Sequence, residues 1–151
     1  MKKCLLLFAS VLFFSCSAYV PVNVSPQSSS KEYELETSKD DLYVQVNNWM
    51  IDSFENAKSV IDFSDKEAGI ITGKYLIGEV YSASNNYGLT DVYATVRVQI
   101  KDDYAKLTVT PENYQYIDSG DVSEDHKLPV EKVNRQVNTL LESFEQYVAK
   151  N

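Results

Sequence analysis

With 151 residues and a net charge of −8, the chain is long enough for one domain with a sizeable core, and it is too acidic for a typical nucleic-acid-binding protein. Its two cysteines, Cys4 and Cys16, lie at the N-terminal end, so the rest of the chain has no thiol for a disulfide or a zinc site. His126 is the only histidine, which excludes a His-rich metal site. The composition therefore predicts no metal and no cofactor.

Residues 1–15 are typical of a bacterial signal peptide. Lys2 and Lys3 precede an apolar run, residues 4–14, that is too short to span a bilayer. Removal of the two lysines brings the net charge of the mature chain to −10. Such a charge opposes contact with anionic headgroups, so we expect membrane attachment through a lipid only.

Two cleavage sites compete around Cys16. Cleavage before Cys16 gives a lipoprotein with the lipid on that thiol, although Phe13-Phe14-Ser15 departs from the usual lipobox. Cleavage after Ala18 gives a soluble secreted or periplasmic protein. We expect the lipoprotein, anchored to the outer membrane. No acidic run follows Cys16, which favours a domain that faces the periplasm.

Residues 16–31 predict a lipidated Cys16 followed by a flexible tether. They contain Pro21, Pro26 and a run of serines, without a helical period. The alternative is an extended segment that lies partly on the surface of the domain. The remainder, residues 32–151, is predicted to be a single domain.

A helix is predicted to start at Ser38. Ser38 is a typical N-cap, and Asp40 and Asp41 follow in the first turn, where the helix dipole favours carboxylates. Apolar residues then recur on one helical face: Leu42, Val46, Trp49, Met50 and Phe54. This spacing indicates that Trp49 anchors the core rather than stacks on a ligand.

Most of the remaining chain up to residue 117 has the pattern of a meander of strands. Strands are predicted at residues 33–36, 59–63, 69–80, 92–100, 107–111 and 114–117, with a polar hairpin loop at residues 82–88. The clearest is residues 92–100, in which apolar and polar side chains alternate. Glycines inside residues 69–80 predict a bulge or a close backbone approach.

A second helix is predicted after an acidic loop at residues 118–127, with Pro129 in its first turn. Its apolar stripe consists of Val130, Val133, Val137, Leu140, Leu141, Phe144 and Val148. The stripe fits a helix docked on a sheet, and the alternative is self-association through a short seam. Helices at both ends of a strand meander predict an α+β domain, with an antiparallel sheet of about five strands and two helices packed on one face.

The order and spacing of these segments resemble a known family. The matching features are the helix start at residues 40–43, the apolar helix end at residues 49–51, and the sequence DKEAGII at residues 65–71 followed by Gly73-Lys74. Over roughly residues 33–116 the chain resembles the bacterial family described as a domain of unknown function with a TBP-like fold, found in exported envelope proteins. The resemblance implies a TBP-like fold and an envelope location. It implies no catalytic residue and no DNA binding.

The tyrosines offer a candidate binding face. Tyr75, Tyr93, Tyr114 and Tyr116 lie on or near predicted strands, and Tyr93 alternates out of phase with the core residues of its strand. If its neighbours share that phase, the solvated face of the sheet carries an aromatic patch of the kind that is enriched at recognition surfaces. The alternative is that these tyrosines fill half-exposed strand positions without a function.

The acidic loop is the place where we would look for a bound cation. Its candidate ligands for calcium are Asp118, Asp121, Glu124, Asp125 and His126. Their spacing does not match an EF-hand loop, and a solvated acidic loop is the preferred interpretation.

No nucleophile elbow or phosphate-binding loop is present, so we expect that the protein is not an enzyme. The predicted function is a binding module that presents an aromatic sheet face or loops to an unknown protein or glycan partner. One alternative is an assembly module that self-associates through its C-terminal helix. Another, less favoured, is a carboxylate-dependent hydrolase.

Overall fold

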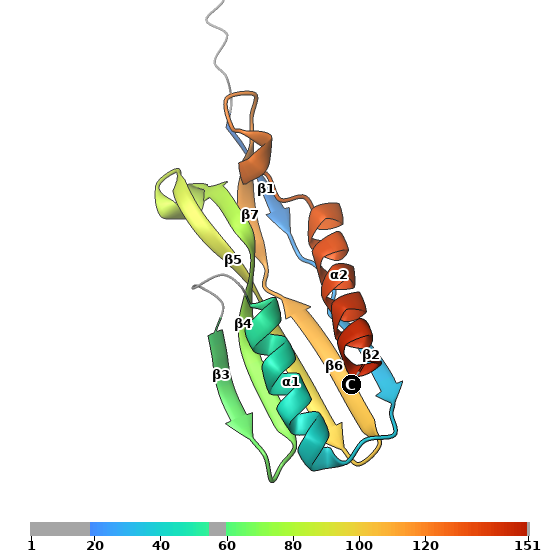
Figure 1. Ribbon diagram of the computed structural model, residues 1–151. Helices are drawn as coiled ribbons and strands as arrows, with labels where there is room; N and C mark the ends of the chain where they lie inside the picture. The colour runs from blue at the N-terminus through green and yellow to red at the C-terminus, as the bar shows by residue number, and fades with distance from the viewer. Residues whose placement is uncertain (1–18, 55–59, 151) are drawn as a thin grey trace, which may run out of the picture.

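The computed structural model describes residues 19–54 and 60–150 (Figure 1). The elements in chain order are β1 (Val20–Val24), β2 (Ser29–Glu34), α1 (Lys39–Ser53), β3 (Val60–Asp65), β4 (Ile70–Ser82), η1 (Ala83–Asn85), β5 (Gly88–Lys101), β6 (Tyr104–Pro111), β7 (Tyr114–Asp118), η2 (Glu124–His126) and α2 (Val130–Val148). The predicted signal peptide and Cys16 lie outside the described residues, so cleavage and lipidation stay predictions. Among the helices that are described, none is long and apolar enough to cross a membrane.

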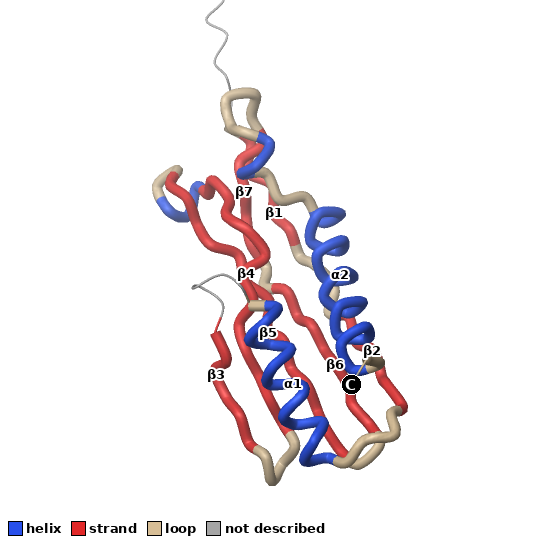
Figure 2. The backbone as a smooth tube through the Cα atoms, viewed as in Figure 1, coloured by secondary structure: helices blue, strands red, loops and turns tan. Residues whose placement is uncertain are grey.

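Five strands form one antiparallel sheet in the order β2-β6-β5-β4-β3. Both helices lie against the same face of this sheet (Figures 1 and 2). β1 and β7 form a separate antiparallel pair beyond the N-terminal end of α2. The predicted α+β class, with two helices on one face of a five-stranded antiparallel sheet, is confirmed.

The central strand β5 shows how the sequence separates the two faces of the sheet. Side chains alternate between the faces of a strand, so residues two apart share a face. The buried set of β5 is Val92, Ala94, Val96, Val98 and Ile100. The exposed set is Thr95, Arg97, Gln99 and Lys101. The apolar set faces the helices, and the other face is open and polar.

The two helices contact each other above the sheet. Trp49 of α1 and Phe144 of α2 are buried, and their rings meet edge to face with centroids 4.8 Å apart. The indole Nε1 of Trp49 donates a hydrogen bond to Ser143 Oγ at 3.1 Å, which satisfies its polar atom. The prediction that Trp49 anchors the core is confirmed. A buried Phe contributes about 2–3 kcal/mol to stability.

The apolar stripe of α2 packs into the core. Five of its residues have an exposed fraction of 6 % or less: Val133, Val137, Leu140, Phe144 and Val148. This burial confirms the docked helix. Self-association of folded chains through this stripe would need the helix to leave the sheet, so the fold gives that alternative no support.

The predicted flexible tether at residues 16–31 is wrong for the residues that the structure describes. β1 pairs with β7, from Val20 opposite Asp118 to Val24 opposite Tyr114, and β2 pairs along its length with β6. The strand predicted at residues 33–36 correspondingly begins earlier and ends at Glu34.

The residues that suggested a tether are compatible with strands at the edge of a sheet. Pro21 is exposed in β1, which pairs on one side only, and an edge strand tolerates the missing N–H of proline. The serine run pairs as well, and Ser28 Oγ lies 2.9 Å from Thr110 Oγ1. Alternation of Val20, Val22 and Val24 was the strand signal, and the prolines and serines obscured it.

The β4–β5 hairpin is longer than the sheet that contains it. β3 pairs with β4 only as far as Lys74, and β6 pairs with β5 only as far as Ala94. The outer half of the hairpin continues toward β1 and β7 (Figure 1). A register shift between Leu76 and Gly78 marks the start of this outer half. The bulge predicted for the strand glycines is therefore confirmed at Gly78.

Candidate binding site

The structure separates the four tyrosines that the sequence predicted to share the open face of the sheet. Tyr75 lies on the helix-covered face, and its ring packs against Phe54 at the end of α1, with centroids 5.5 Å apart. Tyr93 lies on the opposite, open face, and its hydroxyl donates to Asp91 Oδ2 at 3.0 Å. These two tyrosines therefore cannot contribute to one surface.

Tyr114 and Tyr116 belong to β7 and lie outside the five-stranded sheet. The hydroxyl of Tyr114 is hydrogen-bonded to the carbonyl oxygen of Leu128, and Tyr116 is only 7 % exposed. The predicted patch of Tyr75, Tyr93, Tyr114 and Tyr116 is wrong, because one lies on the open sheet face and three lie in or beside the core.

A different set of tyrosines forms a cleft at the far end of the hairpin. The cleft has a volume of about 550 Å³ and is lined by Tyr19, Tyr81, Tyr87, Ile117, Asp121 and Val122. We call it the tyrosine cleft. Ligand sites in proteins typically measure about 300–1,000 Å³, are mainly apolar and carry a few polar groups. Its single carboxylate and three hydroxyl-bearing rings fit that description.

The hairpin tip that carries Tyr87 has an unusual backbone. Ser82 Oγ accepts a hydrogen bond from Ser84 N–H and starts the short helix η1. Asn86 and Tyr87 then both adopt positive φ angles, 49° and 59°. Asparagine tolerates this left-handed region, but a bulky residue there is uncommon and strained. The tip therefore holds the ring of Tyr87 outward, 57 % exposed, at a conformational cost.

The opposite wall of the cleft comes from the β1–β7 pair. Tyr19 immediately precedes β1, and its ring lies 5.6 Å from that of Tyr87. Ile117 of β7 is 1 % exposed and supplies a rigid apolar surface. The two aromatic rings thus meet across the cleft from segments that are distant in the sequence.

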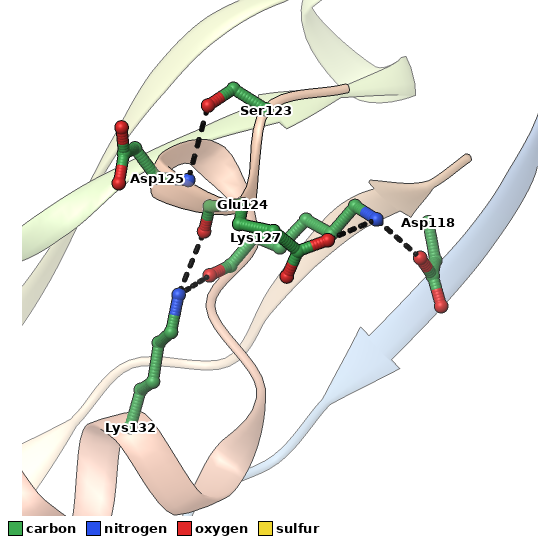
Figure 3. A network of polar contacts seen from close by, with 6 residues as sticks. All are labelled: Asp118, Ser123, Glu124, Asp125, Lys127 and Lys132. Atoms are coloured by element: carbon green, nitrogen blue, oxygen red, sulfur yellow. Dashed lines mark hydrogen bonds and ion pairs between the residues drawn. The ribbon is translucent and has the colours of Figure 1, made fainter. Parts of the chain in front are cut away.

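The loop that carries Asp121 and Val122 is fixed by a network of lysines (Figure 3). Lys127 Nζ lies 3.0 Å from Asp118 Oδ1 and 2.8 Å from Glu124 Oε1. The hydrogen bond to Glu124 raises the pKa of the Lys127 ammonium most, and the hydrogen bond to Asp118 raises it further.

Lys132 Nζ ties the same loop to α2 by donating to two carbonyl oxygens, those of Glu124 at 2.7 Å and Lys127 at 3.0 Å (Figure 3). A lysine ammonium therefore occupies the acidic loop where a calcium ion was considered. The part of the chain that the structure describes contains no cluster of three or more His, Cys, Asp or Glu side chains suited to a metal ion.

His126 lies beside the cleft, where its ring packs against a tyrosine of the lining. Its ring meets Tyr81 edge to face, with centroids 5.2 Å apart and an interplanar angle of 87°. This contact connects η2 to the end of β4 and limits the movement of the Tyr81 ring.

A family model matches the sequence, and two solved structures are similar to this chain. The family described as "Domain of unknown function (DUF4468) with TBP-like fold" matches residues 35–116, which include Tyr81 and Tyr87 of the cleft. A crystal structure of a DUF4468 family protein from Bacteroides ovatus is 20 % identical, with a TM-score of 0.45 over 80 % of this chain and 81 % of the other. A TBP-like protein from Parabacteroides distasonis is 14 % identical, with a TM-score of 0.47 over 77 % and 90 %. No curated protein matches the chain. Because the family match spans more than half of the sequence, this chain belongs to the DUF4468 family of domains of unknown function with a TBP-like fold.

Proposed function

We propose that this protein is a non-enzymatic binding module of the bacterial cell envelope, held at the outer membrane by a lipid on Cys16, and that the tyrosine cleft receives its protein or glycan partner. The observation that carries the proposal is the cleft itself. Tyr19 and Tyr87 are 54 % and 57 % exposed at a cleft of about 550 Å³, although neither ring is needed to fill the core.

Tyrosine suits a recognition role at this place for two physical reasons. Its ring buries a large area at a small cost in conformational entropy, and its hydroxyl still offers a hydrogen bond to the ligand. The cleft is also organised before binding, because the Lys127 network fixes one wall and the Tyr81–His126 contact fixes another. Preorganisation reduces the entropy lost on binding.

The lining of the cleft favours binding over hydrolysis. Glycoside hydrolysis, for example, generally uses two carboxyl groups on opposite sides of the scissile bond. Among the described residues that line the tyrosine cleft, one carries a carboxylate, Asp121. Glu79 and Asp91 are opposite each other on the hairpin, but neither belongs to that lining.

Site-specific photocrosslinking in intact cells tests the proposal. A benzophenone amino acid would replace Tyr87 at the cleft or, as a matched control, Phe63 of β3, which is 53 % exposed and far from the cleft. We expect an adduct from position 87 only, and we expect Tyr81→Ala to reduce its yield. Digestion of the adduct with protease or with glycosidases then distinguishes a protein partner from a glycan. Equal adducts at both positions, or an adduct unaffected by Tyr81→Ala, would contradict a ligand in the cleft.

A further inference from the structure

Exposed apolar side chains are concentrated on the segments that form the tyrosine cleft. Of the seven large hydrophobic side chains that are exposed in the described residues, four belong to these segments. Tyr19 and Val20 come from the start of β1, Tyr87 from the hairpin tip and Leu89 from β5, and their exposed fractions run from 43 % to 57 %. The other three, Val44, Ile51 and Phe63, lie on α1 and β3, away from this end (Figure 1). We call the set of four the rim.

The rim lies next to the predicted lipid attachment site along the chain. Only residues 17 and 18 separate Cys16 from Tyr19. Three residue steps span at most about 11 Å when fully extended. β1 is paired with β7 from Val20 onward, so the domain has no long tether with which to stand away from the membrane. The headgroup layer on each side of a bilayer is about 5–7 Å thick.

From these two observations we propose that the rim rests in the headgroup region of the membrane that holds the lipid on Cys16. The proposal rests on the lipidation included in the proposed function. An acyl chain on Cys16 would hold Tyr19 within about 11 Å of the bilayer surface. Tyrosine favours this interface, because its ring is apolar and its hydroxyl can stay hydrated. Val20 and Leu89 would lose contact with water there.

The charges of this end of the molecule indicate which lipids suit the rim. Asp121 lines the cleft, and Asp125 lies in the same acidic loop, whereas Lys127 and Lys132 are already bound to groups within that loop. Carboxylates are repelled by anionic headgroups, so the rim suits a zwitterionic lipid surface. The tyrosine cleft would then open close to the bilayer surface.

A fluorescence experiment with the full-length lipidated protein tests this orientation. The protein would be purified from membranes, its lipid on Cys16 verified by mass spectrometry, and reconstituted into phosphatidylcholine vesicles. Tyr87→Trp places a reporter on the rim, and Phe63→Trp places one at a similarly exposed control position. Trp49, the only natural tryptophan, is 1 % exposed and gives the same background in both variants and in the parent protein.

We expect the emission of the Tyr87→Trp reporter to shift to the blue in vesicles and to be quenched when the phosphatidylcholine carries brominated acyl chains. The Phe63→Trp reporter should show neither change. Leu89→Trp offers a second rim position if the first variant does not fold, and it should behave like Tyr87→Trp. A blue shift that appears in native membranes and not in pure lipid vesicles would show that a protein covers the rim, which would overturn lipid docking.

The results distinguish a failure of rim docking from a failure of the proposed ligand in the cleft. If vesicle-bound, lipidated protein shows equal quenching of the rim and control reporters, docking of the rim is wrong, while the crosslinking test of the cleft is unaffected. If mass spectrometry shows an unmodified N-terminal Tyr19, the anchor and the docked orientation both fail. A cleft ligand would still be detected by the adduct at position 87.

Discussion

The helix-covered half of this molecule and its cleft end use aromatic residues in opposite ways. In the helix-covered half, Trp49, Phe144 and Tyr33 pack ring against ring and are almost inaccessible to solvent. At the cleft end, Tyr19 and Tyr87 also contact each other, yet each is more than half exposed. The same residue class therefore stabilises the core in one region and remains accessible to a ligand in the other.

The residues that adopt positive φ angles also differ between the two regions. At the sheet end, positive φ angles belong to Gly69, which adopts them without cost, and to Asp103, whose short polar side chain tolerates them. At the hairpin tip, an equivalent positive φ of 59° is adopted by Tyr87. Strain of this kind is retained at functional sites more often than in structural turns. The hairpin tip therefore keeps a residue that is unfavourable for its backbone conformation, whereas the residues at the sheet end suit theirs.

Removal of the Phe144 ring should have the largest effect. Phe144 is 0 % exposed and contacts both Tyr33 and Trp49, so Phe144→Ala leaves a cavity at the junction of the helices and the sheet. We expect a loss of about 3–5 kcal/mol in the free energy of unfolding. Urea denaturation measures it. The control is Phe63→Ala, at a residue that is 53 % exposed, which should change stability by about 0.5 kcal/mol or less. Similar losses in both variants would contradict the assignment of Phe144 to the core.

Gly69→Ala should be the next most damaging change. A Cβ at Gly69 would lie 2.2 Å from the carbonyl oxygen of Ile100, and its φ of +66° disfavours any side chain. The Gly69 carbonyl also accepts the N–H of Ile100 at 2.7 Å, so the turn cannot shift without breaking this bond. We expect a loss of about 2–4 kcal/mol. Gly120→Ala is the matched control, because no atom lies within 4 Å of its added Cβ. A melting temperature equal to that of the control would refute the close approach.

The core could be predicted from sequence because each of its elements carries a strong local period. Leu42 to Phe54 repeat at helical spacing, Val92 to Ile100 alternate, and both patterns survive in the structure as buried faces. Strand β1 was missed, and the start of β2 was placed too late, because Pro21, Pro26 and the serines are turn and linker residues in most contexts. Only pairing with β7 and β6, which a local pattern does not reveal, makes these segments ordered.

The cleft could not be predicted for a related reason. Tyr19 lay in the presumed tether, and Tyr87 lay in a loop whose direction is set by two consecutive positive φ angles. The sequence Asn86-Tyr87-Gly88 at the hairpin tip was the available signal, because a tyrosine between two turn residues is poorly placed for packing. The four tyrosines that the sequence did indicate were selected by strand propensity, and strand propensity favours burial as much as recognition.

An alkaline titration should test the buried hydroxyl of Tyr33. Burial, together with the nearby carboxylate of Glu145, raises the pKa of Tyr33 to about 12, and its hydroxyl donates to the carbonyl oxygen of Leu141 at 3.1 Å. In an unfolded chain the pKa of tyrosine is about 10, so the folded state holds this proton more tightly. The stability from this difference is complete below pH 10 and is lost as the pH rises toward about 12.

We therefore expect Tyr33→Phe to lower stability by about 1 kcal/mol at neutral pH, through the lost hydrogen bond, and to flatten the decline above pH 10. Urea midpoints measured from about pH 8 to about pH 11 give both quantities. Burial also raises the pKa of Tyr114, so part of the decline should remain. Phe63→Ala, which removes no ionisable group, supplies the control, and its slope should equal that of the parent protein. An unaltered slope in Tyr33→Phe would contradict a role for its buried hydroxyl.

The smallest expected effect on stability is at the cleft, where relief of backbone strain and loss of a ring contact oppose each other. Asparagine adopts positive φ more readily than tyrosine does, so Tyr87→Asn should recover part of a strain of roughly 1–2 kcal/mol. Loss of the ring contact with Tyr19 removes about 0.5–1.5 kcal/mol of that gain. We expect these two terms nearly to cancel, so the change in stability stays within about 1 kcal/mol, measured as a urea midpoint. Phe63→Asn, which relieves no strain, supplies the control at a similarly exposed position. A strongly destabilised Tyr87→Asn would mean that the exposed tyrosines serve packing, and the contrast between the two ends of the molecule would disappear.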